Sequence, residues 1–140
     1  MKMRLLKTIL LFSFLFTSVL LAQESKEGFL IHLSSNDAHR VGMALSFADK
    51  MSDDYPVFIF ADIDGISVML KDSENITYDS FKPSKELIDS LIKKGVKIAV
   101  CPMCLEASGH TKYDLSPNID IVSKEDFFKF NTGRIITLDY

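Results

Sequence analysis

The sequence predicts an α/β fold: one domain with three layers, in which helices cover both faces of a five-stranded, mostly parallel sheet. Two observations lead to this prediction. Short apolar runs of strand length alternate with stretches whose apolar residues recur at helical spacing, an order typical of parallel strands joined by right-handed crossovers. The strand runs also lack polar alternation, as expected of strands that are covered on both faces. Ligand sites in such sheets lie beyond the carboxyl ends of the strands.

The first 22 residues have the layout of a secretory signal peptide. A start with three Lys or Arg residues precedes an apolar run over residues 8–21, and the small residue Ala22 follows. We therefore expect a signal peptide over residues 1–22, a domain over residues 23–140 and a periplasmic or secreted location. Contact with a membrane is expected only during export, and an uncleaved anchor is the alternative.

Charge and composition exclude several classes of protein. Removal of the expected signal peptide takes away three positive charges and no negative one, so the net charge changes from −3 to −6. Nucleic acid is therefore not an expected partner, because its binding depends on positive charge. Hydrophobic residues make up 47% of the chain, which argues against disorder and suffices for one core. Two cysteines are too few for a disulfide framework.

The first predicted strand covers residues 29–33, and residues 34–37 after it are of types that cap helices. The next stretch is helical, because its apolar residues recur at positions 41, 44, 45 and 48. A second apolar stripe lies beside the first and consists of Met43, Phe47 and Met51. Because the helix is apolar around more than half of its circumference, we expect it to pack on the sheet and to contribute to a subunit interface.

The second predicted strand covers residues 57–61, a continuous run of β-branched and aromatic residues. A turn over residues 62–65 follows it. Residues 66–70 fit either a short helix or an irregular stretch, and the polar segment over residues 71–81 is predicted to be a surface loop.

The third unit is a helix followed by a strand over residues 96–100. Ser84 is a residue type that caps helices, and the apolar residues after it recur at helical spacing. Gly95 follows two lysines and is the expected stop signal of this helix.

The last part of the chain predicts two strands and one helix. A short strand over residues 119–122 comes first, and a strand over residues 134–138 ends the sheet. Between them, Ser123 and Asp126 have the spacing of a capping box at the start of a helix. This helix carries an aromatic cluster that we expect in the core or a subunit interface: Phe127, Phe128 and Phe130.

Both cysteines lie in one Cys-Pro-Met-Cys tetrapeptide directly after the strand over residues 96–100. Pro102 suits the first position of a helix, so Cys101 falls where the strand gives way to a helix. A thiol at this place faces unpaired amides and the positive end of the helix dipole, which favour the thiolate. We therefore predict that Cys101 is a reactive sulfur at an exposed edge of the sheet, with Cys104 beside it. The alternative is a pair of small buried hydrophobic residues.

Further polar residues are expected near the same edge of the sheet. They lie at the end of the first strand, follow the first or second strand, or lie close to the cysteines in sequence: His32, Asp37, His39, Asp62, Asp64 and His110. A carboxylate among them would help to position a substrate or accept a proton from a thiol. Aspartate is also the common residue of turns and caps, and histidine often has a purely structural hydrogen bond, so both roles stay open.

The residues around the cysteines resemble the DsrE/DsrF-like family. In residues 95–109 an apolar strand ends in a cysteine, and a short helix of small residues closes with a glycine, as in the cysteine segment of that family. Residues 36–48 resemble its first helix, and residues 57–61 its second strand. The resemblance implies a doubly wound domain that assembles as trimers or hexamers and passes persulfide sulfur between proteins.

The resemblance also assigns roles to individual residues. Cys101 occupies the place of the sulfur-carrying cysteine of the family, and Cys104 matches a second cysteine that a subset of members has. The chain departs from the family pattern at Ser108, where an arginine commonly precedes the closing glycine. The expected export is a second departure, because the sulfur relays of the family work in the reducing cytoplasm.

The functional hypothesis is an exported protein that handles sulfur, persulfide or thiol redox chemistry through Cys101 and Cys104. Whether it is a sulfur carrier or a sulfurtransferase-like enzyme is left open by the sequence. The expected partners are a sulfur-donor or acceptor protein, or a small thiol, together with further copies of this chain. No cofactor is expected. An oxidising compartment favours a disulfide between the two cysteines, so thiol–disulfide exchange is a second hypothesis.

Two alternatives lie further from this hypothesis. The two cysteine sulfurs, with Met103 and His110 close in sequence, are ligand types that suit copper(I). A zinc site is not expected, because zinc requires four firm ligands and the chain has no second cysteine pair. The other alternative is an oligomeric protein without chemistry of its own.

Overall fold

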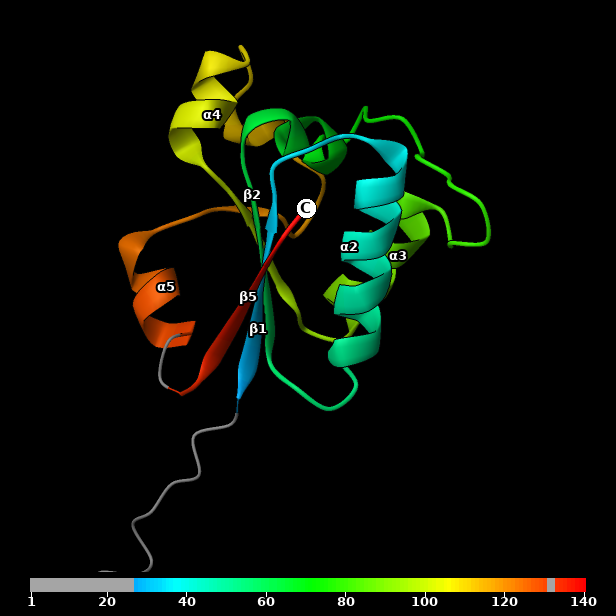
Figure 1. Ribbon diagram of the computed structural model, residues 1–140. Coiled ribbons are helices and arrows are strands. Elements are labelled where there is room, and N and C mark those ends of the chain that lie inside the picture. The colour runs from blue at the N-terminus through cyan, green and yellow to red at the C-terminus, as the bar shows by residue number, and fades with distance from the viewer. Residues whose placement is uncertain (1–26, 131–132) are drawn as a thin grey trace, which may run out of the picture.

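The computed structural model describes residues 27–130 and 133–140, and the expected signal peptide over residues 1–22 lies outside this part (Figure 1). The described residues form one five-stranded sheet with the strand order β4-β3-β2-β1-β5, in which every pair of neighbours is parallel. The strands are β1 (Gly28–Leu33), β2 (Val57–Ala61), β3 (Lys97–Val100), β4 (Asp120–Ile121) and β5 (Ile135–Asp139). The predicted parallel sheet is confirmed.

Helices cover both faces of this sheet, as predicted. The described helices are α2 (Ala38–Met51), α3 (Ser84–Lys93), α4 (Pro102–Ala107) and α5 (Lys124–Phe130), with two 3₁₀ helices, η1 (Ile63–Met69) and η2 (Lys112–Asp114). Figure 1 shows α2 and α3 together on one face, α5 on the other, and α4 beyond one end of the sheet. The chain runs outward from β1 to β4, and α5 then returns across the opposite face to place β5 beside β1. No helix of the described part has both the length and the apolar character needed to cross a membrane.

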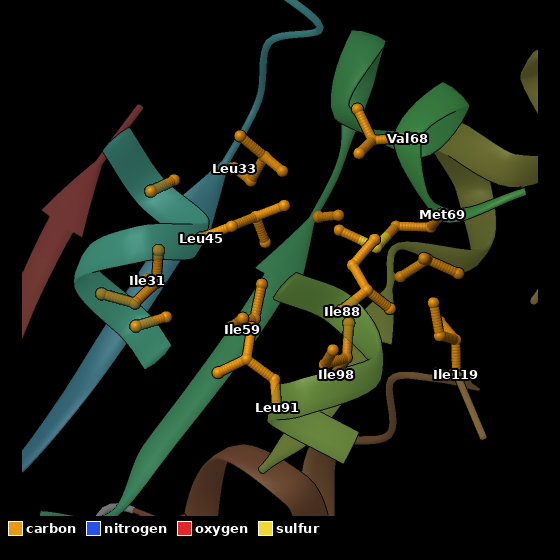
Figure 2. Close-up of a cluster of buried hydrophobic side chains, with 14 of the residues drawn as sticks. Ile31, Leu33, Leu45, Ile59, Val68, Met69, Ile88, Leu91, Ile98 and Ile119 are labelled. Atoms are coloured by element: carbon orange, nitrogen blue, oxygen red, sulfur yellow. The ribbon is translucent and has the colours of Figure 1, made fainter. Parts of the chain in front are cut away.

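Strand β2 supplies side chains to both layers, because successive residues of a strand point to opposite faces. Ile59 belongs to the main core with residues of α2 and α3, and Figure 2 shows it among Ile31, Leu45 and Leu91. On the other face, the ring of Phe58 lies 5.5 Å from that of Phe127 and 5.6 Å from that of Phe130. Two of the three phenylalanines of α5 therefore cover the sheet, whereas Phe128 is exposed.

Helix α2 is capped as the sequence predicts. The Oδ1 atom of Asp37 accepts a hydrogen bond from the backbone N–H of Arg40 at 3.1 Å. Of the second apolar stripe, Phe47 and Met51 pack against the core of their own chain, and only Met43 is exposed. The stripe thus contributes mainly to the interior.

Helix α3 begins one residue earlier than predicted. Pro83 occupies the N-cap position, and Ser84 is the first helical residue rather than the cap. The hydroxyl of Ser84 is buried and accepts a hydrogen bond from the backbone N–H of Ile76 at 2.9 Å. The Oδ1 atom of Asn75 instead accepts from the N–H of Lys85 at 3.1 Å, so the loop before the helix supplies the cap.

The structure decides the undecided stretch after β2 and confirms the capping box before α5. The segment expected as a turn followed by an undecided stretch is a single 3₁₀ helix, η1, whose buried residues Ile66, Val68 and Met69 close the core. The capping box at the start of α5 is confirmed: the backbone N–H of Ser123 donates to Asp126 at 2.7 Å, and the backbone N–H of Asp126 donates to the Ser123 hydroxyl at 3.3 Å.

Candidate functional site

The two cysteines lie where β3 ends and α4 begins. Cys101 is the N-cap residue of α4, and Pro102 takes the first helical position, as the sequence predicts. Cys104 lies on the first turn of α4 and is half-buried, and both thiols are free. The backbone N–H of Cys101 donates to the carbonyl oxygen of Ala61 at 2.9 Å, which ties the site to the end of β2.

Cys101 is less open than predicted. Only 9% of its surface is exposed, because its backbone still follows the ladder between β2 and β3. The predicted support from the amides of α4 is also wrong: among the described residues, the Cys101 side chain makes no capping hydrogen bond. Helix α4 is six residues long and therefore has a small dipole.

The amide that reaches the dithiol comes from η1 instead. The backbone N–H of Ile63 and the side chain of Cys101 both lie close to the sulfur of Cys104. The Ile63 amide lowers the pKa of Cys104, but the neighbouring Cys101 side chain, burial and the charge of Asp62 outweigh it and raise that pKa. A raised pKa disfavours the thiolate of Cys104.

Sequence reasoning missed Ile63, whose side chain is 62% exposed. Its backbone is in the left-handed region with φ of 45°, a conformation that β-branched residues rarely adopt. The available signal was its place two residues after the end of β2, the strand that neighbours β3.

The turn that carries Ile63 is fixed against β1. The backbone N–H of Asp62 donates to the carbonyl oxygen of Leu33 at 3.1 Å, and the N–H of Gly65 donates to the carbonyl oxygen of Asp62 at 2.8 Å. A Cβ atom at Gly65 would lie 2.1 Å from the Leu33 carbonyl oxygen. Only glycine fits this close approach of two backbones.

His32 lies between two carboxylates at the same end of the sheet. Its Nδ1 atom is 2.7 Å from Oδ1 of Asp139, and its Nε2 atom is 3.0 Å from Oδ1 of Asp62. The imidazole also stacks on the ring of Phe60, with centroids 5.6 Å apart. Among the described residues, Nε2 and the facing Asp62 oxygen are buried and have no other polar partner. Burial lowers the pKa of His32, but the two carboxylates outweigh it and raise the pKa above 6.5.

Of these three residues, the sequence pointed to His32 and Asp62. Asp139 was missed, because its partner is 107 residues away and the pairing of β5 with β1 decides the contact. The place of Asp139 at the end of the last predicted strand was the only signal.

The remaining predicted residues take other positions. Asp37 acts as the cap of α2 described above. The ring of His39 stacks on Tyr78 at 4.5 Å and lies near Phe81, so it contacts the loop that covers α2. His110 and Asp64 line a hollow of about 120 Å³ together with Ile63.

A model of the DsrE/DsrF-like family matches residues 12–132. The chain belongs to the DsrE/DsrF-like family. This confirms the resemblance seen around the cysteines. No curated protein matches the chain.

Two solved structures are similar to this DsrE/DsrF-like protein in fold. A protein of unknown function from Methanobacterium thermoautotrophicum, MTH1491, has a TM-score of 0.64 and 23% sequence identity, over 80% of this chain and 99% of that chain. The ychN protein from E. coli has a TM-score of 0.59 and 11% identity, over 81% of this chain and 99% of that chain. At these identities the likeness shows the shared α/β fold.

The described part of this DsrE/DsrF-like protein contains no group of three His, Cys, Asp or Glu side chains that could hold a metal ion. Met103, a predicted copper ligand, is 76% exposed. His110, another, lines the hollow with Asp64 and Ile63 described above.

The stability of this DsrE/DsrF-like protein should depend on pH through His32. Because the folded state raises the pKa of His32, its contribution is fully present below about pH 6.5 and is lost as the pH rises through the raised value. Urea unfolding of the wild type and His32→Gln between about pH 5 and pH 8 measures this contribution as the difference in unfolding free energy. We expect the difference to shrink with rising pH, and a constant difference would contradict the assignment.

Proposed function

We propose that this protein carries sulfane sulfur on Cys101 and that Cys104 is the resolving thiol. Membership of the DsrE/DsrF-like family is compatible with a role in sulfur chemistry. The observation that carries the proposal is the pair of free cysteines at the junction of β3 and α4, with Cys101 at the N-cap position. We assign the carrier role to Cys101 because it takes the place of the sulfur-carrying cysteine that the family resemblance implies, and because the raised pKa of Cys104 disfavours a thiolate there.

In the first step, the Cys101 thiolate attacks the outer sulfur of a donor persulfide, R–S–SH. The sulfur–sulfur bond of the donor breaks, a persulfide forms on Cys101, and the donor leaves as the thiolate R–S⁻. No net oxidation occurs in this exchange. An acceptor thiolate takes the outer sulfur by the same reaction in reverse.

The position of Cys104 adds a second outcome. Its thiolate attacks the Cys101 sulfur of the persulfide, sulfide (HS⁻) leaves, and a disulfide forms between Cys101 and Cys104. The outer sulfur is reduced to sulfide while the two thiols are oxidised by two electrons. An external dithiol reductant restores the pair. The close approach of the two thiols favours this redox route as the second candidate function.

We also propose that the protein works outside the cytoplasm, in the periplasm or as a secreted protein, on the basis of its first 22 residues. Its partners are a sulfur donor and acceptor, either proteins or small thiols. Exposed Ile63 and Met103 beside the dithiol offer apolar contacts to a protein partner. Assembly into a homo-oligomer, a trimer or a hexamer, belongs to the same proposal.

Sulfur loading of the reduced protein tests the proposal. After incubation with glutathione persulfide, mass spectrometry should find an adduct of about 32 Da on the Cys101 peptide. Cys101→Ser should lose the adduct, whereas Cys104→Ser should accumulate it, because the resolving thiol is absent. Phe128→Ala, a change of an equally exposed residue on α5, is the matched control and should load like the wild type.

The opposite pattern would reverse the two roles. An adduct that persists in Cys101→Ser and disappears in Cys104→Ser would make Cys104 the carrier. Unmodified thiols in the wild type, after exposure to the donor, would contradict sulfur carriage altogether.

A further inference from the structure

A chain of contacts connects the imidazole of β1 with the dithiol at the end of β3. His32 contacts the carboxylate of Asp62 at 3.0 Å. The residue before Asp62, Ala61, accepts a hydrogen bond from the Cys101 N–H at 2.9 Å, and the amide of the residue after it, Ile63, lies close to Cys104. We propose that His32 is a positioning residue of the dithiol: it holds the Asp62 carboxylate in place and offsets its negative charge beside Cys104. This inference rests on the proposed function only in taking the dithiol as the reactive site.

The first part of the argument is geometric. The peptide between Asp62 and Ile63 carries the N–H that reaches Cys104. Asp62 is held through its own N–H by Leu33, through its carbonyl oxygen by Gly65 and through its side chain by His32. The left-handed backbone of Ile63 costs about 1 kcal/mol and persists only where such contacts hold it. Of the three contacts, only that with His32 involves a side chain that can be replaced without altering the backbone.

The second part is electrostatic. The charged groups that face His32 are Asp62, from the end of β2, and Asp139, from β5. Those whose charge acts on Cys104 include the same Asp62, which raises the pKa of that thiol. Asp62 therefore belongs to both sets, and its negative charge disfavours a thiolate on the dithiol. A protonated His32 at 3.0 Å offsets that charge, and a neutral His32 leaves it uncompensated.

The nearest contacts of His32 also orient it for this role. Asp139 binds Nδ1 and thereby directs Nε2 toward Asp62, as a carboxylate orients the imidazole in many histidine sites. The stack on Phe60 holds the plane of the ring. At a given pH, the dithiol should thus react faster when His32 is charged than when it is neutral.

Alkylation of the reduced protein by iodoacetamide tests this inference, with each cysteine followed by peptide mass spectrometry across the pH range. Relative to the wild type, His32→Gln should slow alkylation of the dithiol by about 3- to 10-fold near pH 6, the effect of losing one nearby positive charge. The two rates should converge at higher pH, where His32 of the wild type is neutral. Loosened packing alone would give a ratio that does not depend on pH.

Asp62→Asn locates the effect. It should raise the alkylation rate above that of the wild type at high pH, and His32→Gln should have no further effect in its background. His39→Gln is the matched control, because His39 stacks on Tyr78 and Phe81 and should leave the profile unchanged. A ratio that stays constant with pH, or the same change in His39→Gln, would overturn the inference.

One measurement on the wild type keeps the inference testable if His32→Gln does not fold. The alkylation profile should contain an inflection at the pH where NMR shows His32 to titrate, and its absence contradicts the proposal. Alkylation requires no sulfur donor, so this result stands apart from sulfur loading. Failure to load sulfur would contradict the proposed function but would not contradict the role of His32 at the dithiol.

Discussion

Gly65→Ala is expected to lower the free energy of unfolding by about 3 kcal/mol or more. The added Cβ atom would lie 2.1 Å from the carbonyl oxygen of Leu33 and 2.9 Å from its carbonyl carbon, both backbone atoms of β1. A central strand does not move aside, so η1 has to shift and lose the hydrogen bond between Asp62 and Leu33. Urea unfolding measures the change as a shift of the midpoint.

The displacement of η1 in Gly65→Ala should also change the reactivity of the dithiol. Displacement of η1 carries the Ile63 amide away from Cys104 and removes its lowering effect on the pKa of that thiol. We therefore expect slower alkylation of Cys104 in Gly65→Ala than in the wild type. The matched control is Gly95→Ala: this position has φ of 78° but no atom within 4 Å of an added Cβ, so only backbone strain of about 1 kcal/mol is expected. Equal losses in both variants would contradict the proposed clash.

Phe58→Ala is expected to cost about 4 kcal/mol of unfolding free energy. Phe58 lies on β2 with 1% of its surface exposed, and its ring contacts those of Phe127 and Phe130 on α5. Truncation leaves a cavity between the sheet and α5, the helix that leads the chain back to β5. Thermal and urea unfolding followed by circular dichroism measure the loss.

Phe128→Ala provides the control on the same helix. This phenylalanine is 76% exposed, so its truncation should change the unfolding free energy by about 0.5 kcal/mol or less. A large loss in Phe128→Ala would mean that the outer face of α5 is covered in solution. A small loss in Phe58→Ala would show that α5 adds little to the stability of the sheet.

The sequence predicted most elements because their signals are local. The apolar run of β2 has the predicted bounds, and the caps of α2 and α5 are made by Asp37 and Ser123, as predicted. The error at Ser84 has a non-local cause, since the cap of α3 comes from Asn75, ten residues before the amide that it binds. The structure of η1 depends on the close approach of Gly65 to β1, which residue spacing does not reveal.

Only the local features of the candidate site were predicted, because residue patterns report on neighbours in sequence. The place of Cys101 and Cys104 between a strand and a helix follows from adjacent residues, and so does the position of Pro102. The sequence did not reveal that an amide of η1, rather than those of α4, contacts the dithiol. It also did not reveal that Cys101 is buried, because burial depends on how far the ladder with β2 extends.

By itself, the sequence determined the family, the alternation of strands and helices and the dithiol at the end of β3, since motifs and periodicity are properties of neighbouring residues. Only the tertiary structure decided which distant groups meet there. The return of the chain across the sheet places β5 beside β1, and this brings Asp139 to His32. The parallel pairing of β1 with β2 brings Asp62 to the same imidazole. The pairing of β2 with β3 brings the start of η1 to the dithiol. Strand order and register arise from contacts between segments far apart in the chain, which is why these partners of the dithiol appear only in the folded molecule.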